Sequence, residues 1–380
     1  MKTGLYLILL IFIATSANLY SQEKKDTTKT SPLGIGVTLS ENKAGKKLDS
    51  LNDKKLGIIG YPYAFYSPEK QLAFGLGGML FFRLGMLKKI NLSKIVASAY
   101  YTTNDQYNFS ITPKIYFPGV KQLYLESKIN FSKEEGKYYG TGNNTYESDS
   151  ANYLSNIFYF KAAISGYNLF KTVQTGFVYE YKNSRIKDKR NNAFLKDSST
   201  KGANDGKIGG LGLGFLLDKR DNVSYPEKGT YVNLQAILYR KPFGSNYTYN
   251  KFFLDIRQFV MPFESHILAF QVLGDLTTGE VPFFSMPALG GSTNMRGYFE
   301  GRYRDYQYFT AQAEYRKILF WRIGINAFYS IGQVANRLSG FKMNEFHSSY
   351  GGGLRFVFDP EEKINLRVDI GVANGKTGIY

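Results

Sequence analysis

Alternation of apolar and polar side chains most constrains this chain, because it runs with a period of two through most of the sequence. Near the end of the chain, Leu366, Val368 and Ile370 alternate with Arg367 and Asp369. Successive side chains of a β-strand point to opposite faces, so such a segment forms a strand with one apolar and one polar face. The pattern predicts an all-β chain whose strands separate two unlike environments.

About sixteen segments carry this pattern, and single-chain bacterial outer-membrane barrels have an even number of strands. We expect strands at 57–66, 71–83, 92–102, 107–117, 121–133, 152–165, 168–182, 207–218, 229–240, 247–261, 265–277, 304–318, 319–332, 347–358, 363–373 and 376–380. The longest connections are 134–151, 183–206, 278–303 and 333–346, and short ones include 166–167, 262–264 and 359–362. Long and short connections alternate along the chain, as the outer loops and periplasmic turns of a transmembrane barrel do. The alternative fold is a soluble β-sandwich, which does not require long and short connections to alternate.

Composition agrees with a membrane barrel. Aromatic residues make up 16% of the chain, nearly all of them Tyr and Phe, and such barrels carry aromatic girdles. The mean hydropathy of −0.29 is unremarkable because inward polar residues offset outward apolar ones. The net charge of +17 is scattered along strands and loops, so we expect no nucleic-acid partner. We predict a transmembrane antiparallel β-barrel with its apolar face toward lipid.

The first residues indicate export. Lys2 precedes an apolar run of about ten residues and then a small-residue stretch, which is the pattern of a signal peptide. We predict a signal peptide at 1–22, a flexible periplasmic lead-in at 23–55 and the barrel at 56–380. The chain has no cysteine, which excludes disulfides and lipoprotein anchoring. We expect the cell outer membrane of a Gram-negative bacterium as the location.

The densest motif lies in the long connection 278–303, where the sequence reads Pro-Ala-Leu-Gly-Gly-Ser-Thr-Asn-Met-Arg-Gly-Tyr from Pro287 to Tyr298. Glycines permit tight backbone turns, and one arginine among apolar residues suggests a buried loop tip. We expect Arg296 to pair there with a carboxylate.

This loop resembles the conserved loop of the BamA/TamA outer-membrane assembly superfamily, the bacterial surface antigen family, whose core is Val-Arg-Gly-Phe/Tyr. Further motifs follow in the order of that family from about Gly57 to the end of the chain. They are Asp218-Lys219-Arg220-Asp221-Asn222 with Pro226 and Gly229, Ala313-Glu314-Tyr315-Arg316, Tyr350-Gly351-Gly352-Gly353-Leu354-Arg355, and Leu366-Arg367-Val368-Asp369. The resemblance implies a periplasmic turn motif formed by Asp218, Arg220, Asp221, Pro226 and Gly229.

The resemblance also implies a clamp inside the barrel, formed by Arg296, Gly297 and Tyr298 of the loop with Glu314. The family places an aspartate where this chain has Ser330. A hydroxyl accepts a hydrogen bond but does not neutralise a guanidinium, so we expect the clamp to depend more on Glu314. The alternation adds three lumen-facing charges, Arg316, Arg367 and Asp369.

The function that the resemblance implies is assembly or translocation of outer-membrane proteins. Residues between the signal peptide and the barrel are too few for a periplasmic POTRA domain, so the chain resembles the short members that lack one. Two alternatives remain, a passive or gated channel and a membrane partner of a separate periplasmic protein. The expected partners are outer-membrane lipid and lipopolysaccharide, unfolded outer-membrane protein clients, or a POTRA-type periplasmic protein.

We expect no enzymatic activity, no cofactor and no metal site. The chain has two histidines, His266 and His347, which the predicted strands place at opposite ends of the barrel. A hydrolase of the Ser-His type needs its serine and histidine within hydrogen-bonding reach. No group of Asp, Glu and His has the spacing of metal ligands.

The last predicted strand, 376–380, is short, because a membrane-spanning strand needs about 9–11 residues. Two explanations stay open at this point: a weak seam that suits lateral opening, or a sequence that stops before its natural end. We expect the second.

Overall fold

The computed structural model describes residues 56–82, 84, 93–117, 123–146, 151–169, 173–188, 193–196, 200–223, 225–359 and 364–380. The predicted signal peptide and lead-in, 1–22 and 23–55, lie outside the described residues. The expectations about export and periplasmic organisation therefore stay predictions.

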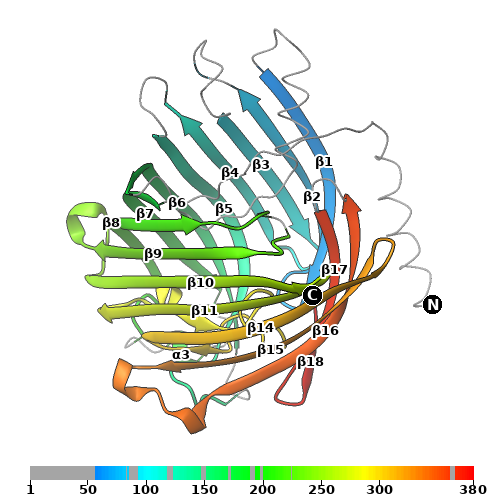
Figure 1. The fold of residues 1–380 in the computed structure, drawn as a ribbon. Coiled ribbons are helices and arrows are strands. Elements are labelled where there is room, and N and C mark those ends of the chain that lie inside the picture. Colours follow the sequence, from blue (N-terminus) through cyan, green and yellow to red (C-terminus); the bar gives the residue numbers. More distant parts are fainter. Residues whose placement is uncertain are drawn as a thin grey trace.

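Sixteen strands form one antiparallel sheet that curves around an interior (Figure 1). They are β1 (Leu56–Ser67), β2 (Gln71–Phe82), β3 (Ser93–Thr102), β4 (Tyr107–Tyr116), β5 (Tyr124–Tyr138), β6 (Ala151–Leu169), β7 (Val173–Asp188), β8 (Asp205–Asp218), β9 (Gly229–Tyr239), β10 (Tyr249–Phe263), β11 (His266–Gly279), β14 (Gln307–Phe320), β15 (Ile323–Ala335), β16 (His347–Asp359), β17 (Ile364–Ala373) and β18 (Lys376–Ile379). Neighbours in this order are hydrogen-bonded to one another. The predicted all-β fold and its strand number are confirmed.

The sheet has an apolar outer face and a polar inner face, as the alternation predicted. Phe177 and Val368 point outward with exposed side chains, whereas Glu314 and Asp369 are buried inside. Each outward side chain of this kind would meet lipid hydrocarbon, and each inward one would meet other polar groups. No helix in the described part of the chain is long and apolar enough to cross a membrane.

Several strand boundaries differ from those predicted. β5 continues to Tyr138 and β7 to Asp188, through segments predicted as loops. The predicted turn at Gly166-Tyr167 is wrong, because both residues lie within β6 and are in register with β7. The turn between β10 and β11 is shorter than predicted, since β10 includes Phe263.

The connection between β11 and β14 contains the remaining small elements and folds across the interior. It includes η3 (Phe283–Ser285) and a two-stranded sheet of β12 (Ala288–Leu289) and β13 (Tyr303–Arg304). The other short helices of the described chain are η2 (Lys241–Phe243), α3 (Ala193–Lys196), η4 (Leu338–Gly340) and η5 (Met343–Glu345). Leu289, Met295 and Tyr298 of the connection form an apolar cluster with residues of the sheet. This packing holds the loop inside.

The first and last strands of the sheet form a seam. β1 and β18 lie side by side (Figure 1), but in the described chain the sheet order contains no hydrogen-bonded pair between them. β1 pairs with β2 over twelve positions, and β18, which has four residues, pairs with β17. Tyr380 extends the latter pairing through two backbone hydrogen bonds of 2.9 Å to Asp369.

Candidate functional site

The loop tip Met295–Gly297 lies directly on the inner face of β17. Met295 and Gly297 have φ values of 73° and 109°, which turn the backbone tightly on both sides of Arg296. A Cβ at Gly297 would lie 2.9 Å from the carbonyl carbon of Val372, and one at Gly371 would lie 2.7 Å from the amide nitrogen of Gly297. Glycine at both positions therefore permits the two backbones to touch.

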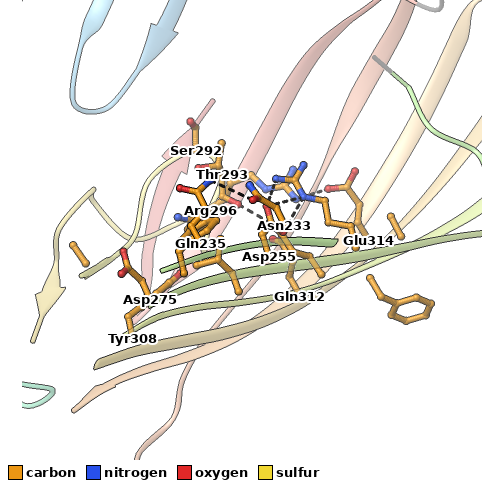
Figure 2. A pocket seen from close by; sticks show the side chains of 18 of the residues that line it. Asn233, Gln235, Asp255, Asp275, Ser292, Thr293, Arg296, Tyr308, Gln312 and Glu314 are labelled. Atoms are coloured by element: carbon orange, nitrogen blue, oxygen red, sulfur yellow. Dashed lines mark hydrogen bonds and ion pairs between the residues drawn. The ribbon is translucent and has the colours of Figure 1, made fainter. Parts of the chain in front are cut away.

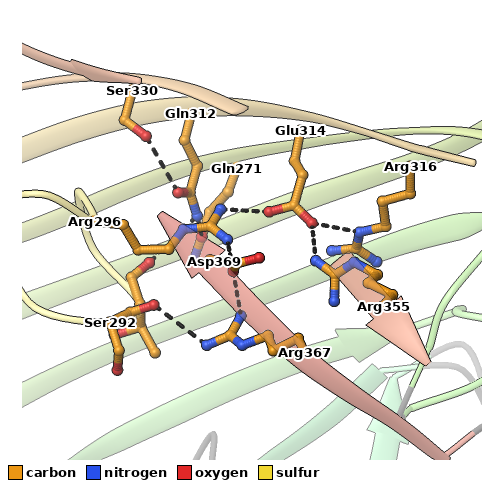
Figure 3. A network of polar contacts seen from close by, with 11 residues as sticks. Gln271, Ser292, Arg296, Gln312, Glu314, Arg316, Ser330, Arg355, Arg367 and Asp369 are labelled. Carbon is orange, nitrogen blue, oxygen red and sulfur yellow. Dashed lines mark hydrogen bonds and ion pairs between the residues drawn. The ribbon is translucent and has the colours of Figure 1, made fainter. Parts of the chain in front are cut away.

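Arg296 forms two ion pairs at this tip (Figure 3). One guanidinium nitrogen contacts Glu314 of β14, and the other lies 2.5 Å from Asp369 of β17. Arg296 is 4% exposed and Asp369 is fully buried. The expected contact with Glu314 is present, and the loop folds into the interior as predicted.

The expectation about Ser330 is wrong. Its hydroxyl is 3.5 Å from the side-chain oxygen of Gln312, and no contact joins it to Arg296 among the described residues. Asp369 supplies the second carboxylate instead, from a different strand. The clamp therefore does not depend mainly on Glu314, because two carboxylates share the guanidinium.

Glu314 also pairs with two further arginines. Its Oε1 atom accepts from Arg316 Nε at 2.7 Å and from Arg355 Nη2 at 2.5 Å. Arg355 belongs to one of the family motifs, but its position in that motif did not indicate a contact with the clamp. The predicted lumen-facing charges Arg316, Arg367 and Asp369 all lie at this site, as Figure 3 shows.

The aromatic ring of Phe328 packs against the arginine of the clamp. The guanidinium carbon of Arg296 is 3.6 Å from the ring centroid of Phe328 in β15. Such stacking favours arginine over lysine, because the planar cation lies flat on the ring. Phe328 lies two residues before Ser330 and therefore on the same face of its strand. This spacing is the sequence feature that could have indicated a contact between Phe328 and Arg296.

Tyr298 and Tyr380 connect the loop to the end of the sheet. The backbone N–H of Gly297 donates to the Tyr380 hydroxyl at 3.0 Å, and that hydroxyl donates to the Tyr298 carbonyl at 3.3 Å. The Tyr298 hydroxyl lies 3.1 Å from Asn374 Oδ1 in the turn between β17 and β18. Burial raises the pKa of Tyr298 to about 12.

The predicted turn motif forms the connection between β8 and β9. Asp218 and Arg220 make an ion pair of 2.9 Å, and Asp221 accepts backbone N–H bonds within the turn. Gly229 has a φ of 113° where a Cβ would clash with the Lys219 carbonyl. Pro226 is buried, and its neighbour Tyr225 places its ring 5.5 Å from the Arg316 guanidinium. The motif thus shapes a turn that reaches the clamp through a residue the sequence did not single out.

A polar cavity of about 570 Å³ lies beside the clamp (Figure 2). Its wall includes Arg296, Glu314 and the loop residues Ser292 and Thr293. The rest of the wall consists of charged and amide side chains from β6, β7, β9, β10, β11, β14 and β17, together with apolar ones such as Phe253 and Leu273. The cavity is the space between the folded-in loop and the inner face of the sheet.

Comparison with known proteins agrees with these features. The family model described as the Omp85 superfamily domain matches residues 84–358, which is more than two thirds of the chain. The chain belongs to the Omp85 superfamily. The resemblance that the loop motif indicated is thereby confirmed. No curated protein matches the chain.

Solved Omp85-like structures share the fold at low identity. BamA from Haemophilus ducreyi lacking POTRA domains 1–3 is 13% identical, with a TM-score of 0.61 over 86% of this chain and 69% of that one. CdiB from Escherichia coli is 10% identical, with a TM-score of 0.54 over 84% of this chain and 58% of that one. The chain thus spans under two thirds of the length of CdiB. At this identity the likeness shows the barrel fold.

The two histidines of this Omp85 barrel lie apart, as the strand positions predicted. His266 starts β11 beside Lys317 of β14 and is bonded to the Tyr315 hydroxyl. His347 starts β16 beside Gly332 of β15, at the opposite end of the sheet, where it stacks on the Tyr303 ring at 3.9 Å. Among the described residues, no group of three metal-ligating side chains is placed to hold a metal ion.

Proposed function

We propose that this Omp85 barrel acts in the outer membrane, without enzymatic activity, to insert or translocate client polypeptides through its seam. The observation that carries the proposal is that β1 and β18, the two outer strands in the sheet order, lie next to each other without a hydrogen-bonded pair among the described strands. Each unsatisfied backbone group in hydrocarbon costs several kcal/mol, so an incoming strand that pairs with β1 is stabilised strongly. A client strand added there would extend the sheet by ordinary β-pairing.

The position of the loop supports a link between the seam and the interior. The tip residue Gly297 touches β17 and binds the hydroxyl of Tyr380, so the loop is attached to the strands that border the seam. Movement of β17 and β18 would break contacts of the loop. We propose that the clamp at Arg296 holds β17 and β18 in place beside β1 until a client or a periplasmic partner displaces the loop.

The proposed partners follow from two surfaces of the barrel, its exposed apolar face and the edge of β1. The exposed apolar face fits outer-membrane lipid, including lipopolysaccharide. The β1 edge fits an unfolded outer-membrane protein, delivered by a separate periplasmic protein that carries POTRA-type domains.

A cross-linking experiment tests the proposal, because the chain contains no native cysteine. Ile58→Cys places a thiol on the lipid face of β1, and Leu213→Cys places one on β8, which is paired on both sides. The protein in liposomes would be mixed with an unfolded outer-membrane barrel that carries one cysteine in its last strand. We expect faster client insertion than into empty liposomes, and disulfide capture by the β1 thiol and not by the β8 thiol.

Equal capture at both positions, or no acceleration of insertion, would contradict the seam as a client site. Steady ion conductance without client insertion would instead favour a channel.

A further inference from the structure

The clamp contains more positive than negative charge. Six charged side chains meet there: Arg296, Arg316, Arg355, Arg367, Glu314 and Asp369. Four guanidinium groups thus share two carboxylates, which leaves two positive charges uncompensated among the described residues of the cluster. A cavity with net positive charge attracts anions, because its low-dielectric walls focus the electric field.

The closest contacts of the two carboxylates are with Arg296, Arg316 and Arg355, and the Oδ1 atom of Asp369 is buried without a hydrogen-bond partner. Asp369 lies 2.5 Å from Arg296 but 3.8 Å from the nearest nitrogen of Arg367. The other recorded bond of Arg367 is a long one of 3.4 Å to the Ser292 carbonyl. The Nε atom of Arg355 is buried and has no hydrogen-bond partner. Arg367, whose side chain is 39% exposed, is therefore the least compensated cation.

The rest of the cavity wall is balanced. Lys161 pairs with Glu180 at 3.7 Å, and Lys251 pairs with Asp275 at 2.9 Å. Arg257 pairs with Asp255 at 2.6 Å. The excess positive charge is thus confined to the end of the cavity that Arg316 and Arg367 line beside the loop.

We propose that this end of the cavity binds a phosphoryl group, held by Arg367 with Arg316 in the same wall. A guanidinium donates two parallel N–H bonds to phosphate oxygens, a geometry that chloride does not match. A phosphate monoester carries about two negative charges at pH 7, which equals the excess of the cluster. Ser292 and Thr293 of the loop also line this cavity. This site goes beyond the proposed client seam and does not depend on it.

The experiment measures phosphate binding to the folded barrel in a neutral maltoside detergent. Inorganic phosphate would be titrated at constant ionic strength, with chloride as the balancing anion, and followed by calorimetry and by the unfolding temperature. Arg367→Gln should raise the Kd for phosphate about tenfold or more. A tenfold change corresponds to about 1.4 kcal/mol of binding free energy, the loss expected for a charge-assisted contact. Lys342→Gln is the matched control, because it removes one exposed positive charge from an outer loop.

A second arm separates the two sources of the phosphoryl group. It uses dihexanoyl phosphatidic acid below its micellar concentration. Saturable binding of both ligands supports a site for free phosphate and lipid headgroups, and binding of the lipid alone supports a headgroup site. Absence of binding by both ligands overturns the proposal, as does an equal response of Arg367→Gln and Lys342→Gln. Folding of each variant is checked by heat-modifiable gel mobility, and phosphate NMR line broadening on the unmodified protein gives a test that needs no variant.

Discussion

At the scale of single residues, Arg296 holds the site together because it joins a loop to two strands. Glu314 keeps Arg316 and Arg355 when Arg296 is removed, whereas Asp369 keeps only the long contact with Arg367. The main consequence of losing the guanidinium is therefore a buried aspartate without a close partner.

Arg296→Ala should destabilise the folded barrel by about 3–5 kcal/mol, the cost of breaking a buried ion pair, and less if water enters the cavity. The transition from folded to unfolded mobility on a gel, followed against temperature, measures this loss. Lys201→Ala is the control, because its pair with Glu280 is exposed on both sides and is worth about 1 kcal/mol at most. Equal transitions for both variants would show that Arg296 adds no stability.

Arg296→Lys tests the shape of the cation rather than its charge. An ammonium group cannot donate to Glu314 and Asp369 with the fork of a guanidinium, nor lie flat on Phe328. We expect the lysine variant to be less stable than the native protein but more stable than the alanine variant. If the lysine variant is as stable as the native protein, the positive charge alone stabilises the site and the shape of the guanidinium contributes nothing.

At the scale of elements, the sequence predicted the strands better than it predicted their ends. A period of two is set by the strand itself, so alternation located each strand of the sheet, with ends that differ by up to about six residues. Gly166 and Tyr167 were taken for a turn because glycine often marks one, but β6 continues through both in register with β7. β5 and β7 extend beyond their predicted ends through charged segments that lack the apolar alternation used to predict strands.

Prediction of the clamp from the sequence was limited in the same way. The Arg296–Glu314 contact followed from a motif and an inward face, whereas Asp369 was known only as an inward charge. Its contact with the loop joins residues 73 positions apart, and local patterns carry no information on such a pairing. Ser330 was chosen by its motif position, but its side chain meets Gln312.

The contact between the loop and β17 can be tested with Gly371→Ala. The added Cβ would lie 2.7 Å from backbone atoms of Arg296 and Gly297, so the loop tip must move away. We expect faster protease cleavage within the loop and a lower unfolding temperature. Gly60→Ala in β1 is the matched control, since its nearest neighbour would be a carbonyl oxygen at 3.7 Å. Resistance of the loop to protease in both variants would contradict the close approach.

Tyr380 gives a test of the contact between loop and seam. Tyr380→Phe keeps the ring but removes the hydroxyl that accepts from Gly297 and donates to Tyr298. We expect faster hydrogen exchange at the Gly297 amide and a loss of about 1 kcal/mol of stability, the worth of an ordinary hydrogen bond. Tyr350→Phe changes a lipid-facing tyrosine and should leave that amide unaffected. Unchanged exchange in the Tyr380 variant would show that the loop and the last strand are independent.

At the scale of the whole molecule, we expect the folded-in loop and the excess positive charge to control any passage of ions through the barrel. The loop fills the interior beside a cavity of about 570 Å³, and its tip is attached to β14 and β17. In planar bilayers we expect low conductance for the native protein and higher conductance for Arg296→Ala, whose loop is released. The current through that variant should favour anions, because Arg316, Arg355 and Arg367 remain against Glu314 and Asp369. Adding Arg367→Gln to Arg296→Ala should shift the reversal potential toward cations in a salt gradient, whereas adding Lys342→Gln should leave it in place. If the double variant with Arg367→Gln keeps the anion preference of the single variant, the uncompensated charge lies elsewhere in the barrel.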